Sequence, residues 1–300
     1  MGDPANLPLW RSPTIVGVLC GTGAALAWAA GFAAARHGVH AGLAPADIAF
    51  HRFVWIGAFL FPLIWRQGLG DLGGIGWRVG LVLAITAGPA QGILSASGFV
   101  LAPLAHGALI QPSNALLGGL LMATLVLGEP LRPRRLIGAA AIIVGLVLLG
   151  TEALKTMGVH ALLGDAIFVA AGLSWALFTI LVRLWRVSAS QAALAIGAVS
   201  LLVYAPAYAM LVGFERMFAA GLWENLLQIA VQGLLAGVLA IHLASRSVIL
   251  LGAGRASAFP AMVPPATMLI GLVFMGEVPT VAQLLGLAVI VIGFRYVLKN

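Results

Sequence analysis

Long runs of apolar residues, each close to the length of a membrane-spanning helix, dominate this sequence. A helix needs about 20 apolar residues to cross the hydrocarbon core of a bilayer. The connections between the runs are too short to hold a soluble domain. The sequence therefore predicts an all-α membrane protein with ten transmembrane helices, at 14–35, 46–65, 77–100, 104–127, 134–150, 162–184, 190–213, 225–250, 255–276 and 280–298.

The composition supports a chain whose surface faces lipid. Hydrophobic residues make up 62% of the chain and charged residues 8%, whereas soluble domains carry about 25% charged residues. The net charge of +7 raises the question of a nucleic-acid partner, but the basic residues lie between the apolar runs and form no concentrated patch. We therefore expect the lipid bilayer as a partner and no nucleic acid. The lone Cys20 excludes an internal disulfide.

A segment of the first half returns near the end of the chain. Residues 108–145 read ALIQPSNALLGGLLMATLVLGEPLRPRRLIGAAAIIVG, and residues 256–293 read ASAFPAMVPPATMLIGLVFMGEVPTVAQLLGLAVIVIG. The two segments are identical at Ala108/Ala256, Pro112/Pro260, Leu121/Leu269, Gly128/Gly276, Glu129/Glu277, Leu136/Leu284, Gly138/Gly286, Ala140/Ala288, Ile142/Ile290 and Gly145/Gly293. Self-similarity at a fixed spacing indicates an internal repeat. We expect one integral membrane domain built from two five-helix units, 1–152 and 153–300.

The positions of the basic residues predict the orientation of the chain. Cytoplasmic connections of membrane proteins carry an excess of Lys and Arg. With a cytoplasmic N-terminus, the inner side would hold Arg11, Arg66, Arg78, Arg132, Arg134, Arg135, Arg183, Arg186, Arg255, Arg295 and Lys299, and the outer side only Arg36, Lys155 and Arg216. Both termini are therefore expected in the cytoplasm. Five spans per unit is an odd number, so the second unit would be inverted relative to the first.

The first span of each unit repeats as well. ALAWAAGF at 25–32 matches GLSWALFT at 172–179, which pairs Trp28 with Trp175 and, farther along, Arg36 with Arg183. Inverted repeats with a site at their interface are typical of secondary transporters, which expose that site alternately to the two sides.

Together, the ten spans, the inverted repeat, the two tryptophans and the Pro…Gly-Glu turn before each final span resemble the drug/metabolite transporter superfamily. The EamA-type branch, and within it the bacterial aromatic amino-acid exporters, is the most similar. The second turn departs from the first, because Gly276-Glu277-Val278-Pro279 shifts the proline by one position relative to Gly128-Glu129-Pro130. The resemblance implies an inner-membrane carrier that exports small metabolites, amino acids included, by alternating access.

Several residues are candidates for lining a central cavity. Gln91 and Ser95 are one turn apart on one helix face, and prolines in the fourth and ninth spans predict bends there that free backbone carbonyls. Tryptophans deep in a span offer flat apolar surfaces, and ionisable groups within a membrane are functional hypotheses by default. The candidate substrate-binding set is Trp28, His51, Gln91, Ser95, Gln111, Asn114, Trp175, His242, Ser245, Pro260 and Met262.

Other features favour structural roles. Gly128-Glu129 and Gly276-Glu277 fit tight turns between helices. Arg52 and Arg246 are expected to extend their long stems toward the membrane surface. The glycines at 138, 145, 286 and 293 predict close helix packing within the fold, with a homodimer interface as the alternative.

The sequence lacks the phosphate-binding and metal-binding motifs that would indicate several classes of enzyme. The sequence has no Gly-x-x-x-x-Gly-Lys phosphate loop, no His-Glu-x-x-His and no metal-ligand spacing, so we expect no cofactor, no metal and no enzymatic activity. The carboxylates lie in loops or near span ends, which favours facilitated transport or histidine-based coupling over a carboxylate relay. The alternatives are an exporter of drugs or other amphiphiles, an intramembrane enzyme, and a receptor or structural subunit without a pathway.

Overall fold

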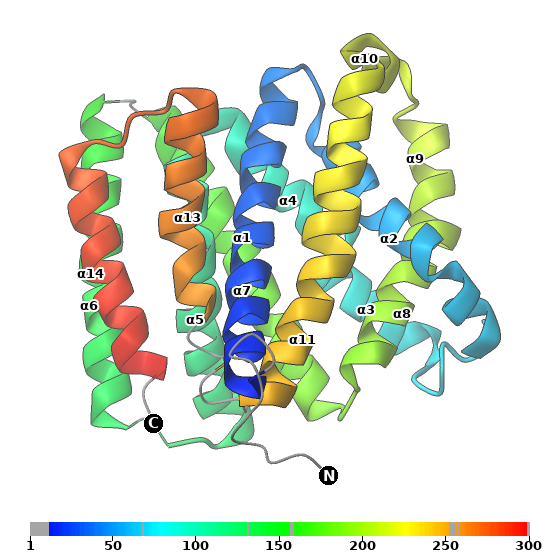
Figure 1. Ribbon diagram of the computed structural model, residues 1–300, viewed down its shortest axis with the longest axis horizontal. Coiled ribbons are helices and arrows are strands. Elements are labelled where there is room, and N and C mark those ends of the chain that lie inside the picture. The colour runs from blue at the N-terminus through cyan, green and yellow to red at the C-terminus, as the bar shows by residue number, and fades with distance from the viewer. Residues whose placement is uncertain are drawn as a thin grey trace.

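The computed structural model describes residues 12–67, 69–130, 132–156, 159–251, 256 and 259–298, and this part of the chain is helical with no strand. The first half holds α1 (Pro13–His40), α2 (Pro45–Gln67), α3 (Gly76–Ala87), α4 (Pro89–Leu101), α5 (Leu104–Leu127) and α6 (Pro133–Thr156). The second half holds α7 (Val159–Leu184), α8 (Ala189–Val199), α9 (Ala205–Leu211), α10 (Glu215–Gln228), α11 (Ala240–Leu251), α13 (Val263–Ile270) and α14 (Val281–Leu298). Figure 1 shows them packed side by side in one bundle.

Several of the expected spans contain a break or more than one type of helix. Gly88 interrupts the expected span 77–100 between α3 and α4, because Pro89 follows it and has no N–H to donate to a continuing helix. The π-helical stretches Ser200–Tyr204, Ile229–Leu239 and Gly271–Met275 continue neighbouring α-helices. Among the described residues, 7 helical segments are long and apolar enough to cross a membrane, and Phe259–Met275 and Val281–Val297 are shorter apolar helices. The count of ten spans stays a prediction.

The prolines of the two repeats have different effects. Pro112 lies inside the continuous helix α5. Pro264 and Pro265 instead lie in the first turn of α13, where a missing N–H removes no helical hydrogen bond. Pro260 belongs to a short 3₁₀ turn, Phe259–Met262, that precedes α13. The described part of the ninth span thus begins as this 3₁₀ turn and continues directly into α13, and the bend expected at its prolines stays a prediction.

The ends of the chain define two ends of the bundle. Figure 1 shows the start of α1 and the end of α14 at the same, lower end of the bundle. We call this the terminal end and the opposite one the far end. Helix α1 ends at the far end, whereas its repeat counterpart α7 ends at the terminal end, as the ion pairs described below require. The matching helices of the two halves thus run in opposite directions.

Helices α6 and α14 pack side by side at one edge of the bundle, and their glycines explain why (Figure 1). A Cβ at Gly138 would lie 2.6 Å from the carbonyl oxygen of Gly293, and one at Gly293 would lie 2.7 Å from that of Gly138. Only glycine permits backbones to approach so closely. The expectation that these glycines serve packing within the fold is confirmed, and this face is not available for a dimer.

The two Gly-Glu turns have the same backbone geometry despite the shifted proline. Gly128 and Gly276 end their helices in the left-handed conformation, with φ of 69° and 68°. The N–H of Glu129 donates to the carbonyl of Ala123, and that of Glu277 donates to the carbonyl of Gly271. These bonds satisfy helix-terminal carbonyls in the same way at both turns. The turn therefore depends on the glycine and not on the proline.

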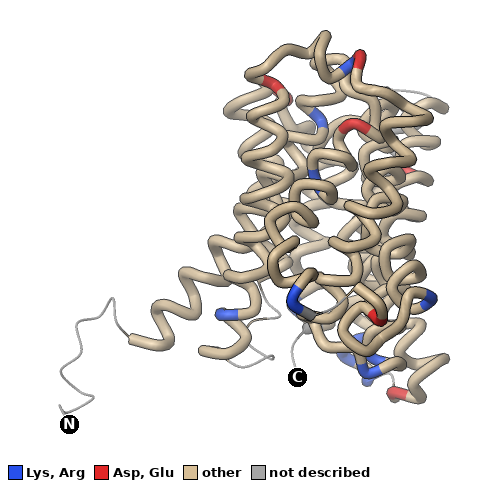
Figure 2. The backbone as a smooth tube through the Cα atoms, turned by 90° about the vertical axis from the view of Figure 1, so that its right-hand side faces the viewer, with Lys and Arg blue, Asp and Glu red and all other residues tan. Residues whose placement is uncertain are grey.

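The perimeter of the bundle is apolar. Large side chains such as Leu125, Phe274 and Trp223 are exposed by 75%, 80% and 82%. Exposure of so large an apolar surface to water would be unfavourable, which indicates that the surface faces lipid and that the chain is a multi-pass membrane protein. Arginines gather toward the terminal end (Figure 2). Of the basic residues expected on the inner side, Arg11, Arg255 and Lys299 lie outside the described residues.

Candidate functional site: a central cavity closed at one end

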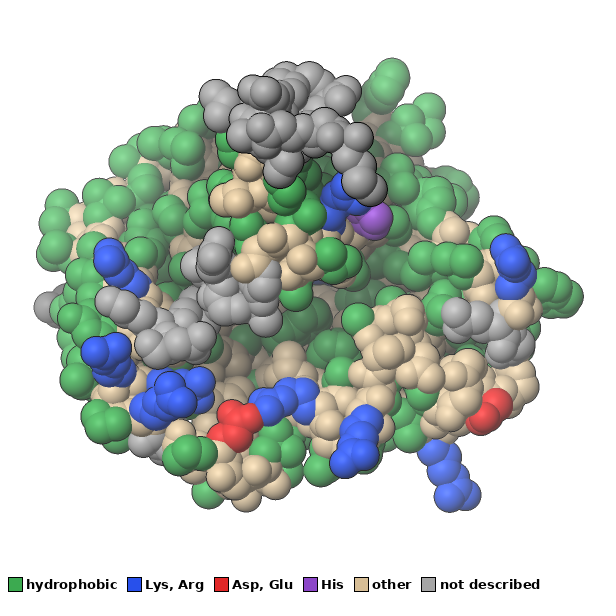
Figure 3. Space-filling model, turned by 60° about the horizontal axis from the view of Figure 1, so that its bottom comes forward, with side chains coloured by type: hydrophobic (Ala, Val, Ile, Leu, Met, Phe, Trp, Pro, Cys, Tyr) green, Lys and Arg blue, Asp and Glu red, His purple; other side chains and the backbone are tan. Residues whose placement is uncertain are grey.

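A cavity of about 610 Å³ lies between the two halves of the chain. Helices α1, α2, α4, α5, α6, α7, α13 and α14 line it, together with Gln232 from the π-helical stretch Ile229–Leu239. Its lining runs from Phe99 and Ala35 near the far end to Glu129, Arg135 and Arg183 at the terminal end. Figure 3, which brings the terminal end forward, shows a hollow bordered by arginine side chains. The cavity therefore opens at the terminal end.

Aromatic and apolar side chains form much of the wall. Trp28 of α1 and Trp175 of α7, which occupy matching positions of the two repeats, both line the cavity. Phe32 and Phe99 meet edge to face at its inner end, with ring centroids 6.0 Å apart. Pro260 also lines the cavity. Such a surface suits the apolar part of a solute.

Polar groups form a smaller arc of the wall. Ser95 of α4 donates a hydrogen bond to Gln111 of α5, with 2.7 Å between the oxygens. Gln91 lies one turn before Ser95 and lines the same cavity. These three candidates are brought together because α4 and α5 are consecutive and antiparallel. They offer uncharged hydrogen-bonding groups to a solute.

Arg52 does not extend toward the membrane surface as expected. Its guanidinium lines the cavity, and Nη1 donates to Oε1 of Gln232 at 3.2 Å. Gln232 in turn donates from Nε2 to the carbonyl oxygen of Gly31 at 2.8 Å. A Cβ at Gly31 would lie 2.8 Å from the Cβ of Ala236, so glycine is needed for α1 to approach this closely. The expectation for Arg52 was wrong because Gln232, far away in sequence, holds the guanidinium inward.

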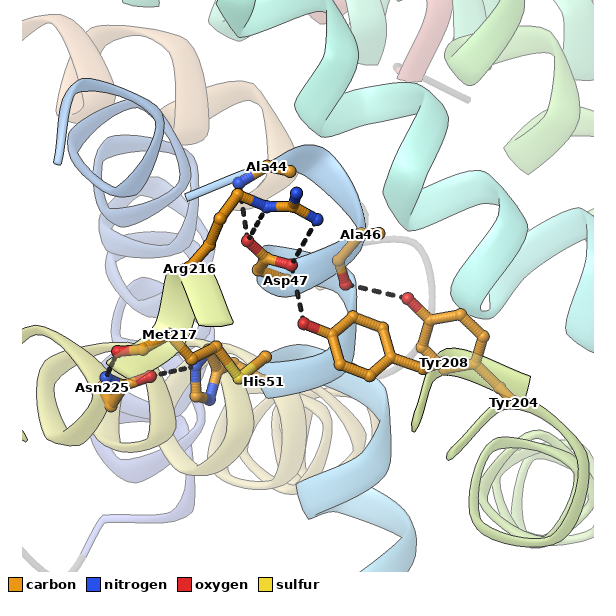
Figure 4. Close-up of polar contacts among 9 residues, drawn as sticks. All are labelled: Ala44, Ala46, Asp47, His51, Tyr204, Tyr208, Arg216, Met217 and Asn225. Atoms are coloured by element: carbon orange, nitrogen blue, oxygen red, sulfur yellow. Dashed lines mark hydrogen bonds and ion pairs between the residues drawn. The ribbon is translucent and has the colours of Figure 1, made fainter. Parts of the chain in front are cut away.

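Five other candidates lie outside the cavity lining. His51 is buried, and its Nε2 is 3.0 Å from Oδ1 of Asn225 on α10 (Figure 4). Asn114 donates from Nδ2 to the carbonyl of Ile110 in its own helix. The side chains of His242 and Ser245 are exposed on the outer face of α11, and Met262 is 39% exposed. The sequence does not show which face of each helix points into the cavity. It therefore could not decide which of these candidates line it.

A buried carboxylate holds the far ends of α2, α9 and α10 together. Asp47 is fully buried and accepts hydrogen bonds from the N–H of Ala44, the hydroxyl of Tyr208 at 2.6 Å and Nε of Arg216 at 3.0 Å (Figure 4). The neighbouring Tyr204 donates instead to the carbonyl oxygen of Ala46 at 2.8 Å. With its charge fully partnered, Asp47 has a structural role at this end.

A second cluster closes the far end above the cavity. Nε of Arg36 on α1 lies 3.2 Å from Oε1 of Glu277, in the turn before α14, and Nη1 donates to the carbonyl oxygen of Phe99 at the end of α4. The other carboxylate oxygen of Glu277 accepts from the N–H of Leu104 at the start of α5, at 3.1 Å. We call these four residues the far-end cluster. They join segments of both halves across the top of the cavity.

The repeat counterpart of this ion pair stands at the terminal end. Arg183, which matches Arg36, forms an ion pair with Glu129, which matches Glu277. Both side chains are exposed, by 52% and 36%, and both line the mouth of the cavity. The hydrogen bond from Arg183 lowers the pKa of the Glu129 carboxyl below its ordinary value. This pair joins α7 to the turn after α5.

The sequence contained a signal for these two pairs. Arg36/Arg183 and Glu129/Glu277 are each identical between the repeats. Their pairing across the halves could have been proposed from the inverted arrangement, whereas the hydrogen bonds to the backbone of Phe99 and Leu104 could not. The sequence analysis also missed a buried contact between His106 of α5 and Asp165 of α7, in which Nδ1 of the histidine lies 2.8 Å from Oδ1 of the aspartate. Within the described residues, no three His, Cys, Asp or Glu side chains gather closely enough to hold a metal ion.

The fold and the cavity define a class: a polytopic membrane protein with a central, partly polar cavity between two repeated halves. The model of the EamA-like transporter family matches the chain twice, at residues 15–151 and 162–298. The chain therefore belongs to the EamA-like transporter family, in which two repeat halves form one helical membrane protein. This membership makes it a membrane transporter of small molecules and speaks against an enzyme.

Comparison with solved structures supports the fold. A crystal structure described simply as that of a protein aligns with a TM-score of 0.62 at 20% sequence identity, covering 93% of this chain and 95% of that one. At this identity the likeness concerns the fold alone. No curated protein matches the chain significantly.

Proposed function

We propose that this protein is a carrier that exports small metabolites, amino acids including aromatic ones, by alternating access through the central cavity. The observation that carries the proposal is the cavity itself, which lies between the repeats, opens at one end and is closed by the far-end cluster at the other. Aromatic walls beside a polar arc suit a solute with an apolar side chain and a polar end. The resemblance to aromatic amino-acid exporters supports the same solute class.

The two ion pairs support an exchange between two states. At the far end, Arg36 and Glu277 each make an additional hydrogen bond to the backbone of α4 or α5. At the terminal end, Arg183 and Glu129 form an ion pair that is exposed at the mouth of the cavity. In an inverted repeat, the second state is obtained by exchanging the conformations of the halves. We therefore expect the terminal-end pair to become the closed cluster when the far end opens.

The remaining parts of the proposal concern placement in the membrane. We propose ten spans, a bacterial inner membrane and a cytoplasmic terminal end, since the arginines gather toward that end. The unit boundaries at 1–152 and 153–300 stay predictions. A homodimer would need a face other than that between α6 and α14. Of the candidate residues, we propose Trp28, Gln91, Ser95, Gln111, Trp175 and Pro260 as substrate contacts.

The decisive experiment is counterflow of radiolabelled amino acids into proteoliposomes that contain the purified protein, with and without a pH gradient. We expect counterflow of aromatic amino acids, reduced by Trp28→Ala and Trp175→Ala. Leu125→Ala, on the lipid-facing perimeter, is the matched control and should leave the rate unchanged. Counterflow no faster than in protein-free liposomes for every amino acid tested would refute amino-acid export. Acceleration by the gradient would establish proton coupling.

One observation favours export of amphiphilic compounds as the second candidate. A smaller cavity of about 230 Å³ shares Trp28 and Pro260 with the central one and lies between α1, α11 and the segment before α13. Val248, which also lines it, is 45% exposed on the perimeter. A solute dissolved in the bilayer would have a short route inward here. This candidate predicts competition by amphiphiles in liposomes where amino acids have no effect.

A further inference from the structure

The central cavity carries an excess of positive charge at its wall. Among the described residues that line it, Arg52, Arg135 and Arg183 are cationic and Glu129 is the one carboxylate. Glu129 and Arg183 pair with each other at the mouth. Deeper in the cavity, Arg52 is accompanied by the neutral amide of Gln232.

Arg52 lacks a carboxylate partner among the residues that the structure describes. The nearest acidic residue on its own helix, Asp47, is already bonded by Tyr208 and Arg216. A guanidinium has five N–H donors, and a single bond to Gln232 at 3.2 Å uses one of them. A cation held within a membrane without a counter-ion is costly, and such residues pair with another group or mark a substrate pathway.

The surroundings hold this guanidinium in place. Gln232 is fixed by its bond to the carbonyl of Gly31, and Gly31 permits the close packing that brings the two together. Gln232 belongs to the π-helical stretch Ile229–Leu239, a form that often occurs at functional sites. The donor is therefore positioned before any solute arrives, and it adjoins the apolar wall that contains Trp28.

From this arrangement we infer that Arg52, positioned by Gln232, binds the carboxylate of an apolar organic acid, and that the transported class is apolar carboxylates in general. The inference rests on the proposed transport function and makes it more specific. A planar guanidinium matches a carboxylate through two parallel hydrogen bonds. The described lining offers no unpaired carboxylate to an ammonium group. An amino acid then binds through its carboxylate, and its amino group is not required.

The test uses purified protein in detergent and three probes that share one phenethyl frame. 3-Phenylpropionate carries only the carboxylate, phenylalanine carries both charges, and phenethylamine carries only the ammonium. Ligands that bind the folded state raise the unfolding temperature in a concentration-dependent way. We expect stabilisation by 3-phenylpropionate and phenylalanine and none by phenethylamine. Equal stabilisation by the amine, or none by either carboxylate, would overturn the inference.

Two variants and a control identify the residue. Arg52→Gln should lower the affinity for 3-phenylpropionate roughly tenfold to hundredfold, the effect of losing a charge-assisted hydrogen bond. Arg66→Gln, on the same helix but exposed and outside the cavity, is the matched control and should bind normally. If Arg52→Gln does not fold, Gln232→Glu replaces it, because it supplies Arg52 with an internal counter-ion and should abolish carboxylate binding. Unchanged binding in either folded variant would contradict the assignment.

Transport is then measured separately, so the two proposals can fail independently. Selective carboxylate binding that depends on Arg52, without counterflow of any labelled acid, would leave the binding site intact and refute the carrier. Counterflow of phenylalanine that phenethylamine inhibits as strongly as 3-phenylpropionate would leave the carrier intact and refute the carboxylate site.

Discussion

Replacing Glu277 with glutamine should open the far end of the cavity. The carboxylate accepts hydrogen bonds from Arg36 at 3.2 Å and from the N–H of Leu104 at 3.1 Å, and the side chains of Arg36 and Glu277 are only 17% and 25% exposed. Glutamine has nearly the same shape, but its amide presents one oxygen and no charge. It would leave the Arg36 guanidinium largely buried with no counter-ion.

The size of the effect follows from the geometry. Two unit charges at 3.2 Å attract by about 5 kcal/mol at an effective dielectric constant of about 20. Desolvation of both charges cancels part of this, and hydrogen bonds to charged groups contribute about 1.5–3 kcal/mol net. The equilibrium between the closed and the open far end should therefore shift by roughly 10-fold to 150-fold toward the open state.

The assay measures access to the cavity from each side of the membrane. Cys20 is replaced by alanine, and a cysteine is introduced at Ala115, which lines the cavity. A membrane-impermeant maleimide then reports how often the cavity faces each side. Glu277→Gln should speed labelling from the far-end side by about the factor given above.

Two further variants sharpen the interpretation. Glu129→Gln, at the exposed counterpart pair, should have a smaller effect because water already solvates both partners. The double variant Arg36→Gln/Glu277→Gln should be milder than Glu277→Gln alone, since no unpaired charge remains. If Glu277→Gln folds normally and labels from the far-end side at the wild-type rate, the far-end cluster is not what closes the cavity.

Three further predictions concern stability and protonation. Tyr208→Phe removes the hydrogen bond to buried Asp47 and should lower the free energy of unfolding, measured by denaturant titration, by about 1.5–3 kcal/mol. Tyr204→Phe should lower it by only about 0.5–1.5 kcal/mol, because the partner of Tyr204 is a neutral carbonyl. Gly138→Ala should cost about 1–3 kcal/mol because its Cβ meets the backbone of α14. Gly119→Ala, with no neighbouring atom within 4 Å, should not destabilise the protein and serves as its control. The pKa of Glu129 is lowered by its arginine partner. Infrared titration should therefore show this carboxyl still ionised at a pH just below its ordinary pKa and protonated only at lower pH. Arg183→Gln should raise the midpoint of this titration.

The repeat and the apolar runs were sufficient to predict much of the fold. Membrane helices must satisfy their backbone hydrogen bonds internally, so length and hydropathy largely decide where they lie. The glycines at 138 and 293 could be assigned to helix packing for the same reason, because only small residues allow such an approach. The break at Gly88 and the start of α13 at its prolines depended on local backbone geometry that hydropathy does not report.

The sequence candidates for the site lie in different places in the structure, and particular residues show why. Trp28 and Trp175 line the cavity, and the symmetry of the repeats placed both on the same face of their helices. His51 and Asn114 were selected for their polarity, yet each is bonded within the helical framework. Polarity identifies a side chain that needs a partner, but the partner can equally be a neighbouring helix or a solute.

Apolar length and internal identity are properties of the chain, so they were enough to identify a helical membrane protein of two related halves. The inward direction of Arg52 toward Gln232, and the closure of one end of the cavity by Arg36 and Glu277, became visible only in the folded chain. Both depend on residues far apart in sequence, and the direction of a long side chain is set by the partner that packing brings within reach.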